Sequence, residues 1–484
     1  MPWRWCLWLS FAAAMRIVQE DAFPSNCTAG TLHLAGRYKV ASLVLNFHPE
    51  VASVVTIHES CRIVAAQAVV LSDAALLFKQ DVFFQGSIHF VGSDRAAPRC
   101  VEVEGNASID EATLTFEACG NVAVEDGGGI YVEKDLAISN SEITFQHCRA
   151  EVGGGAFVGG ALTSRASKIS VFSCHAAGGG GGLFVSKDMS LDASSRIFFE
   201  SCSAAEGEGG GLNILNGNLS IGAGSNMSFK NCSAVAGGGI FMASPQCHLE
   251  QGGSINMSDC RATHSKGGGA VLHDLTQAET AEFNCHRCEA SYGGGGFSAS
   301  GKVLLWGSSN FEDCDASDGR GGAFTGTFVD VMGKVNTRNT SAMDGGAICT
   351  MKTFKINGGE VRIRQSRATH GGAVMALSLK LMKGLLETQD TKAKDGGGSI
   401  HVRVQVLQVS GRLVISNTTA TSGGAIQSPW LVQKGGSISV SNSAAKQMRM
   451  NHLVQAHAGA FALAGGIAQA EPGEAWCCGS SQSP

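Results

Sequence analysis

The sequence predicts an all-β protein, a right-handed parallel β-helix solenoid. Three observations predict it: glycine is abundant, a glycine run recurs at regular intervals, and short alternating stretches lie between the runs. The chain has 65 glycines and only 8 prolines among 484 residues, and 44% of its residues are hydrophobic. That apolar fraction is too high for a disordered glycine-rich tract, and no Gly-X-Y period is present. The glycines therefore serve a folded chain.

The glycine run defines the repeat. Its last glycine is followed by the next at intervals of 24 to 30 residues. These glycines are Gly129, Gly155, Gly182, Gly211, Gly239, Gly269, Gly295, Gly322, Gly346, Gly372, Gly398 and Gly424. A period held over so many copies indicates a repeat architecture. We expect about 12 coils of about 26 residues, with degenerate capping coils at the ends.

The stretches between glycine runs have the period of β-strands. "KISVFS", "SINMSD" and "GRLVIS" alternate apolar and polar residues and contain β-branched side chains. This pattern excludes helical repeats, and neither leucine-rich repeats nor propeller blades fit the motif and its period. Each coil is expected to carry two or three short strands joined by tight turns.

Equivalent positions in successive coils stack roughly 4.8 Å apart, so each repeat position becomes a column. One column is apolar and is expected to fill the interior: Phe116, Phe145, Phe199, Phe229, Met257, Cys285, Phe311, Thr337, Ile363 and Ile415. Three residues later lies a structural cysteine column: Cys119, Cys148, Cys174, Cys202, Cys232, Cys260, Cys288 and Cys314. Cys174 joins this column although Phe172 stands only two residues before it. Thr340, Ser366 and Thr418 continue the column, which indicates a buried corner for small side chains.

Two states of the cysteine column remain open. Neighbouring cysteines would lie within disulfide reach of each other. Small buried thiols also pack well as weakly polar groups, and the Thr and Ser replacements show that the corner does not require a bridge. The "CHRC" at Cys285–Cys288 resembles a metal or redox motif, but its two cysteines belong to different columns, which favours a structural role.

The glycine run is interpreted as a corner. Variable, often charged segments such as "RAEV" and "RATHSK" precede it and are expected to face solvent. The chain then re-enters the stack, where glycine permits a positive φ and close approach between coils. Gly155 is expected to need both properties, whereas Val152 on the outer turn needs neither.

The chain divides into four parts. Residues 1–22 are interpreted as a signal peptide; an ordinary first strand or an imperfect gene model is the alternative. Residues 23–110 are expected to form degenerate β coils that cap the solenoid, and residues 111–445 form the repeats. Residues 446–484 lose the period and are expected to be an irregular tail.

The cysteines and N-glycosylation motifs favour the secretory route. The chain contains 17 cysteines, many for a cytosolic protein. Eight asparagines lie in N-x-S/T motifs: Asn26, Asn106, Asn218, Asn226, Asn231, Asn256, Asn339 and Asn417. A net charge of −5 leaves no basic surface for nucleic acid, and no apolar run is long enough for a membrane span.

Catalytic and metal sites are not expected. Asp318, Asp344 and Asp395 precede glycine runs and would suit calcium, but His370 interrupts the row. Carbohydrate-active β-helices need carboxylates, usually with a basic residue, converging from adjacent coils. The strand stretches show no such cluster recurring in register, so no catalytic residue, cofactor or metal ligand is assigned.

The repeat resembles that of the chlamydial polymorphic outer membrane proteins, whose motifs are G-G-A-[ILV] and F-x-x-N. "GGAI" at Gly345–Ile348 and Gly423–Ile426 and "GGAV" at Gly371–Val374 match the first motif. "FEAC", "FQHC" and "FKNC" keep the second with Cys in place of Asn. The resemblance covers about residues 111–445 and implies the β-helix fold. The family is autotransported through a C-terminal β-barrel, whereas this chain ends in "EPGEAWCCGSSQSP".

The expected function is that of a non-catalytic, secreted or cell-surface β-helix. It would act as a rigid spacer or as an adhesive scaffold that contacts an extracellular glycan or protein. The alternative is a carbohydrate-active enzyme, of the polysaccharide lyase or hydrolase type, on the same fold.

Overall fold

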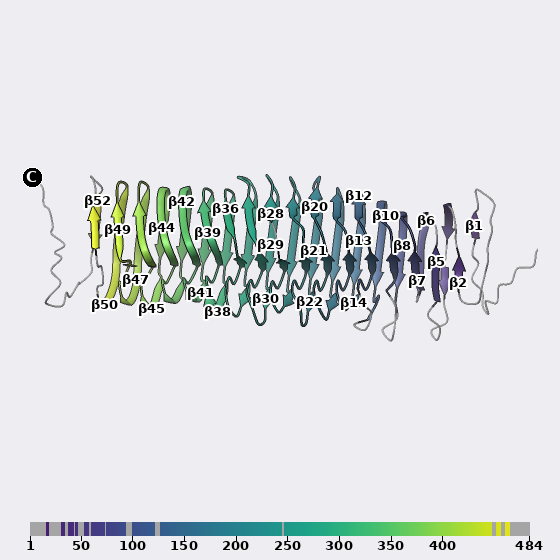
Figure 1. The fold of residues 1–484 in the computed structure, drawn as a ribbon, viewed down its shortest axis with the longest axis horizontal. Helices are drawn as coiled ribbons and strands as arrows, with labels where there is room; N and C mark the ends of the chain where they lie inside the picture. The colour runs from purple at the N-terminus through teal and green to yellow at the C-terminus, as the bar shows by residue number, and fades with distance from the viewer. Residues whose placement is uncertain are drawn as a thin grey trace, which may run out of the picture.

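The computed structural model is an elongated parallel β-solenoid of about 14 turns of about 26 residues (Figure 1). The structure describes residues 60–72, 74–92, 99–121, 126–243 and 246–447, and seven short strands outside these ranges. These residues contain strands and turns but no helix. All 52 strands belong to one sheet, and the strand pairs of successive coils are parallel. The predicted fold class is confirmed.

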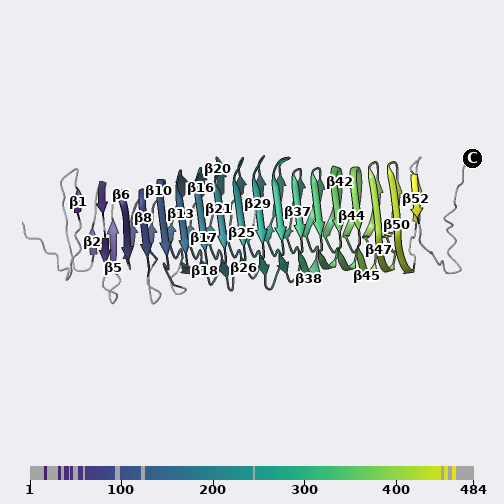
Figure 2. The same cartoon turned by 180° about the vertical axis from the view of Figure 1, so that it is seen from behind.

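Each regular coil has four strands, which we name A, B, C and D in chain order. One coil consists of β15 (Ala156–Val158), β16 (Leu162–Arg165), β17 (Lys168–Phe172) and β18 (His175–Ala176). The prediction of two or three strands was wrong, because D has only two residues in such coils and shows no alternation. In Figure 2 the two-residue strands β18 and β26 lie along the lower edge of the solenoid.

Separate A and B strands form two stacks in the middle of the chain. The A strands are β9 (Val101–Val103), β11 (Ile130–Val132), β15, β19 (Leu183–Val185), β23 (Leu212–Ile214), β27 (Ile240–Met242), β31 (Ala270–Leu272), β35 (Phe297–Ala299) and β48 (Ile426–Gln427). The B strands are β12 (Leu136–Ser139), β16, β20 (Met189–Asp192), β24 (Leu219–Ile221), β28 (Gln246–Leu249), β32 (Asp274–Gln277), β36 (Lys302–Leu305) and β49 (Trp430–Gln433).

C and D strands form two more stacks. The C strands are β13 (Glu142–Gln146), β17, β21 (Arg196–Glu200), β25 (Asn226–Lys230), β29 (Ser254–Ser258), β33 (Glu282–His286), β37 (Ser308–Glu312) and β40 (Lys334–Arg338). The D strands are β14 (Arg149–Ala150), β18, β22 (Ser203–Ala204), β26 (Ser233–Ala234), β30 (Arg261–Ala262), β34 (Glu289–Ala290), β38 (Asp315–Arg320), β41 (Ser341–Asp344), β43 (Arg367–His370) and β45 (Lys392–Gly396).

Elsewhere neighbouring strands merge. The merged strands are β10 (Ala107–Glu117), β39 (Phe324–Val331), β42 (Ile348–Arg364), β44 (Val374–Gln389), β46 (Ile400–Gln408), β47 (Arg412–Ser422) and β50 (Ser437–Gln447). The strands before them are β1 (Arg16–Val18), β2 (Thr31–His33), β3 (Arg37–Ser42), β4 (Val44–Asn46), β5 (Ser53–Ile57), β6 (Cys61–Ser72), β7 (Ala74–Phe78) and β8 (Val82–Val91); those after are β51 (His452–Gln455) and β52 (Ala460–Ala464). The parallel ladder runs from β2 to β52, and β1 pairs antiparallel with β3.

The phenylalanine column fills the interior of the C strands. The rings of Phe199 and Phe229 stack with centroids 4.7 Å apart, and those of Phe116 and Phe145 stack at 4.9 Å. In the coil of β17 the column position is held by Val171, which pairs with Phe145. Phe172 therefore lies on the outer face of the solenoid, half-buried, beside Phe198.

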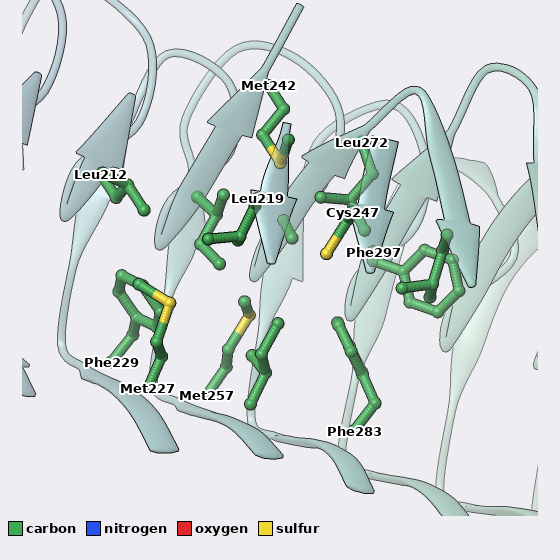
Figure 3. Close-up of a cluster of buried hydrophobic side chains, with 14 of the residues drawn as sticks. Leu212, Leu219, Met227, Phe229, Met242, Cys247, Met257, Leu272, Phe283 and Phe297 are labelled. Carbon is green, nitrogen blue, oxygen red and sulfur yellow. The ribbon is translucent and has the colours of Figure 1, made fainter. Parts of the chain in front are cut away.

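The interior is continuous from coil to coil. Figure 3 shows Phe229 and Met257 pointing into the same space as Leu212, Leu219 and Cys247. All five side chains are at most 2% exposed. Since a coil is too small to bury its apolar face alone, each coil completes its core against the two coils that flank it.

The glycine run has a separate role at each of its three positions. The first glycine has the positive φ, as at Gly153 (φ 68°). The Cβ of an alanine at the second would meet backbone of the next coil, as at Gly154 against Gly181 and His175. The third, Gly155, faces the phenylalanine column, and a Cβ added to it would lie 3.1 Å from the Cβ of Phe145. The expected positive φ at Gly155 was therefore wrong, although the expected close approach is present.

The last glycine of the run does not occupy the same structural position in every coil. Column partners of Gly155 in later coils are Gly296, Ala323, Ala347, Ala373 and Ser399, each directly before the A segment that pairs with its neighbour. Gly295 belongs instead to the second column and is followed by Gly296, so counting Gly295 as the last glycine of its run was wrong. The last glycines of the later runs, Gly322, Gly346, Gly372, Gly398 and Gly424, also belong to the second column. The third position thus tolerates a small side chain in the carboxyl-terminal coils.

Gly294→Ala should destabilise the solenoid, and the adjacent Gly293→Ala should not. Gly294 has φ 62°, and a Cβ on it would collide with the Phe297 carbonyl, whereas a Cβ on Gly293 would lie 3.4 Å from its nearest neighbour, the Arg320 oxygen. A side chain in the left-handed region costs roughly 1–2 kcal/mol before the collision is counted. Denaturant unfolding of both variants measures the difference, and equal stability would contradict this account of the corner.

Phe229→Ala should lower the free energy of unfolding by about 3–5 kcal/mol, because it leaves a cavity between stacked rings. Phe229 is 1% exposed. Phe172→Ala is the matched control, since this ring lies half-buried on the outer face and its loss should cost well under half as much. Chemical denaturation followed by circular dichroism compares the two. A larger loss for Phe172→Ala would mean that the inside and outside of the C strand are wrongly assigned.

Candidate functional site

A polar groove crosses the turns between B and C strands near the amino-terminal end of the regular coils. It has a volume of about 740 Å³ and is open to solvent. Its lining residues are Glu111, Ala112, Thr113, Asn140, Ser141, Glu142, Ala166, Ser167, Lys168, Ala193, Ser194 and Arg196. Four successive coils contribute, so the groove runs along the solenoid axis for roughly 14 Å at the usual strand spacing.

Turn length explains why the groove forms there. Two residues separate β12 from β13 and β16 from β17, three separate β20 from β21, and four separate β24 from β25. Ala193 and Ser194, in the first of the longer turns, line the groove at the side where the turns begin to lengthen. The hollow is therefore a step between short and long turns.

Charged side chains form a row in strict register in the groove. Glu142 pairs along the ladder with Lys168, and Lys168 with Arg196. The Lys168 ammonium lies 2.6 Å from the Glu142 carboxylate, and Gln85 donates a 3.0 Å hydrogen bond to Glu111. The sequence patterns predicted no cluster of carboxylate and basic residues recurring in register, and this row shows that the prediction was wrong. Aligning the first C-strand residue of each coil would have found it.

Three serines form the floor of the groove and its continuation. The Oγ of Ser141 accepts a hydrogen bond from the Ala112 amide (3.0 Å), and that of Ser167 from the Ser141 amide (3.1 Å). The Oγ of Ser195 accepts in turn from the Ser167 amide (3.4 Å). These hydroxyls satisfy backbone groups between coils and are not placed to act as nucleophiles. The exposed groups of the groove are the charged row, Asn140 and Thr113.

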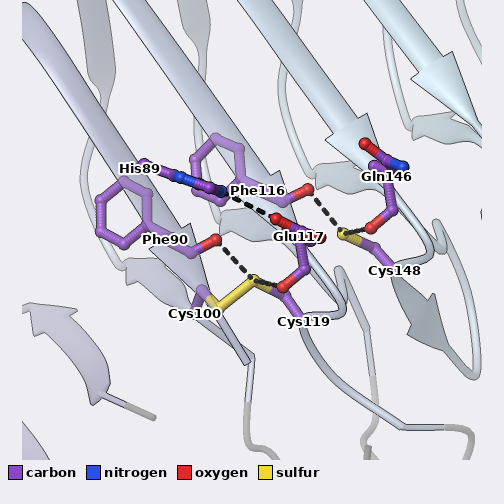
Figure 4. The surroundings of a disulfide bond; sticks show 8 residues. All are labelled: His89, Phe90, Cys100, Phe116, Glu117, Cys119, Gln146 and Cys148. Atoms are coloured by element: carbon purple, nitrogen blue, oxygen red, sulfur yellow. Dashed lines mark hydrogen bonds and ion pairs between the residues drawn. A yellow bond between two sulfur atoms is a disulfide. The ribbon is translucent and has the colours of Figure 1, made fainter. Parts of the chain in front are cut away.

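The cysteine column lies buried at the corner between C and D strands. All eight column cysteines are 0% exposed. Cys148 to Cys314 are free thiols, whereas Cys119 forms a disulfide with Cys100 (Figure 4). Cys100 lies outside the column, directly before β9, and its pairing was missed because no repeat position marks it. Column thiols donate to carbonyls, such as Cys148 to the Phe116 oxygen at 3.4 Å.

Burial controls the chemistry of these thiols. It raises the pKa of Cys174 and Cys232 well above the ordinary range, and that of Cys247, an interior B-strand residue, to about 12. The two cysteines of "CHRC" are both buried, Cys285 in the phenylalanine column and Cys288 in the cysteine column. Thr340 and Ser366 continue the column with a 3.0 Å hydroxyl contact. Within the described residues, no group of three or more His, Cys, Asp or Glu side chains is arranged to hold a metal ion.

The acidic row before the glycine corners is interleaved with basic groups. His370 Nδ1 lies 2.9 Å from Asp344 and its Nε2 lies 3.9 Å from Asp395, while Arg320 Nε lies 3.5 Å from Asp344. Asp318 stays exposed. Because each close neighbour of the buried Asp344 carboxylate is a base, the row forms an ion-pair network and not a set of converging oxygens.

The sequon asparagines that the structure describes lie on the outer surface. Asn218, Asn231, Asn339 and Asn417 are exposed, while Asn106, Asn226 and Asn256 are partly exposed; Asn26 lies outside the described residues. Asn339 and Asn417 each follow a C strand or segment at positive φ and donate to aspartates of the preceding coil, Asp313 and Asp390, at 2.6 and 2.9 Å.

Comparisons with known proteins identify no relative: no family model, no curated protein and no solved structure matches this chain. The class that the fold defines is the parallel β-solenoid. In the part of the chain described here, no helix has the length and apolar character needed to cross a membrane.

The column thiols should resist alkylation in the folded protein. At pH 8, peptide-resolved mass spectrometry should find Cys174, Cys232 and Cys260 unmodified until the solenoid unfolds. Because their folded pKa is raised, the neutral thiols stabilise the fold fully below the unfolded pKa of about 8.5 and lose that contribution as pH rises above it. The free energy of unfolding should therefore fall above about pH 8.5. Rapid alkylation of these peptides under native conditions would contradict the buried column.

Proposed function

We propose that this protein is a non-catalytic structural scaffold, a rigid secreted or cell-surface β-helix that contacts an extracellular glycan or protein. One observation carries the proposal: among the described residues, the buried side chains form one core from Leu76 to Val440. A solenoid with such a core holds its surface groups at fixed spacing, which suits spacing and contact.

The groove is the surface that we assign to ligand contact. Its charged row and amide and hydroxyl groups match the hydrogen-bonding pattern of an oligosaccharide or an extended polar peptide, and we commit to the oligosaccharide. Of the two carboxylates, Glu142 is paired with Lys168 and Glu111 accepts from Gln85. Glycoside hydrolysis requires one carboxyl kept protonated beside another that is ionised. Glu142 is engaged by the Lys168 ammonium and Glu111 by the Gln85 amide, which supports binding over hydrolysis.

Secretion is the second part of the proposal. The exposed and partly exposed sequon asparagines and the Cys100–Cys119 disulfide support an oxidising, glycosylating compartment. Glycans on Asn231, Asn339 and Asn417 would all project from the corner after the C strands, away from the interior.

The test uses the full chain, expressed in eukaryotic secretory cells and collected from the medium, on a glycan array and in lyase and hydrolase assays. Lys168→Ala should weaken binding to any retained glycan about tenfold or more, because a charged hydrogen bond is lost. Lys334→Ala is the matched control, since Lys334 holds the same position on β40 outside the groove. Glycan cleavage abolished by Glu142→Gln would overturn the non-catalytic assignment, and a chain that stays unglycosylated inside the cell would overturn secretion.

A further inference from the structure

An exposed apolar ridge runs along the turn between A and B segments in five successive carboxyl-terminal coils. Each coil contributes one large side chain that is between 39% and 48% exposed. The ridge residues are Phe328, Met351, Leu377, Val404 and Trp430. Single exposed apolar residues are ordinary on a protein surface, but a contiguous series marks an interaction site.

The ridge results from the parallel strand pairing between successive coils. The first residues of the five B segments pair in succession along the ladder, so the A–B turns lie above one another. These residues are Phe328, Thr353, Ser378, Gln405 and Trp430. Met351 and Val404 lie in β42 and β46 where each strand has two residues between paired positions, opposite the single residue Leu377 of β44. At the usual strand spacing the five tips form a line of roughly 19 Å.

The amino-terminal coils lack this ridge. Their A–B turns read "EKD" at residues 133–135, "GGA" at 159–161 and "SKD" at 186–188. In the first and third of these turns an aspartate accepts a backbone amide of the next coil, Asp135 from Ala161 at 2.8 Å and Asp188 from Asn218 at 2.7 Å. Among the described A–B turns before β39, Leu215 (42% exposed) is an isolated large apolar side chain, so the contiguous series begins where A and B merge into continuous strands.

The ridge carries a positive charge on a negative protein. Within the A and B segments of these coils there are four bases, Lys352, Lys355, Lys380 and Arg403, and one acid, Asp330. The local net charge is +3, against −5 for the whole chain. Asp330 is neutralised by Lys355 at 2.9 Å, and the Lys352 ammonium lies 5.0 Å from the centroid of the Phe328 ring.

From this combination we infer that the ridge docks the solenoid edge-on to an anionic lipid surface. Apolar tips in a line enter the interfacial region of a flat bilayer together, while lysine and arginine beside them attract anionic headgroups. Charge argues against a second copy of the chain, because two +3 ridges repel each other. A protein partner would need a complementary acidic groove, whereas a bilayer needs no matching shape. This inference is independent of the groove and of its ligand.

The experiment is co-sedimentation of the full chain with vesicles of phosphatidylcholine containing phosphatidylglycerol, and with phosphatidylcholine alone. Binding is expected to the anionic vesicles and to weaken with salt. Lys352→Gln and Arg403→Gln should each weaken it about fivefold, and Leu377→Ser about tenfold. Tyr292→Ser is the matched control, because Tyr292 is 60% exposed but lies beyond β34, away from the ridge.

Three outcomes would overturn the inference. These are equal binding to both vesicle types, equal effects of Leu377→Ser and Tyr292→Ser, and absence of vesicle binding by the wild-type chain. Circular dichroism and sedimentation velocity on each variant check that it is folded and whether it self-associates. If the wild type self-associates and Leu377→Ser abolishes this without any vesicle binding, the ridge is a protein interface and the lipid assignment is wrong.

Discussion

The backbone hydrogen bonds between successive coils are the constraint on which this structure depends. Along the C strands each coil pairs with the next residue for residue, as β25 does with β29 from Asn226–Ser254 to Lys230–Ser258. A coil can therefore not slip relative to its neighbour without turning its interior side chains outward. Because the strands are fixed by this pairing, successive coils can differ in length only in their turns.

This constraint turns single residues into columns that share one environment. A phenylalanine stacks on the equivalent residue of the next coil, and a buried hydroxyl contacts the equivalent hydroxyl, as Thr340 does Ser366 at 3.0 Å. It also places surface residues of one type in contact: the Asn284 amide donates to Asn256 (2.9 Å) and the Asn310 amide to Asn284 (2.8 Å). The two surfaces proposed for contact, the groove and the ridge, both lie where a column changes composition.

The sequence predicted what is repeated and missed what is not. Phe229 and Met257 were correctly placed in one interior column, because their spacing to the next cysteine is constant. Val171 was missed, because Phe172 offered a more obvious aromatic one position away. The D strands were missed because strands of two residues show no alternation of apolar and polar residues. The separate roles of Gly153 and Gly155 were missed because they depend on backbone angles that composition does not encode.

The groove and the ridge could not be derived from motifs, since neither has one. The groove depends on a difference in turn length between β16–β17 and β20–β21, and the ridge on bulges such as that at Met351. Both are visible only after the coils are aligned in register. The Cys100–Cys119 bond likewise joins a repeated position to an unrepeated one.

That bond gives the solenoid a mechanical polarity. Cys100 precedes β9 and Cys119 follows β10, 19 residues later in the sequence. The bond therefore closes most of a single coil into a covalent ring, called the hoop below. A solenoid frays from its ends, because a terminal coil has a neighbour on one side only. Fraying that starts beyond the hoop at the amino-terminal side stops at it, whereas no described cysteine pair closes a coil toward the carboxyl terminus. A translocating unfoldase or a pulling force would therefore unravel the described coils from the carboxyl-terminal side, taking the apolar ridge apart before it reached the groove.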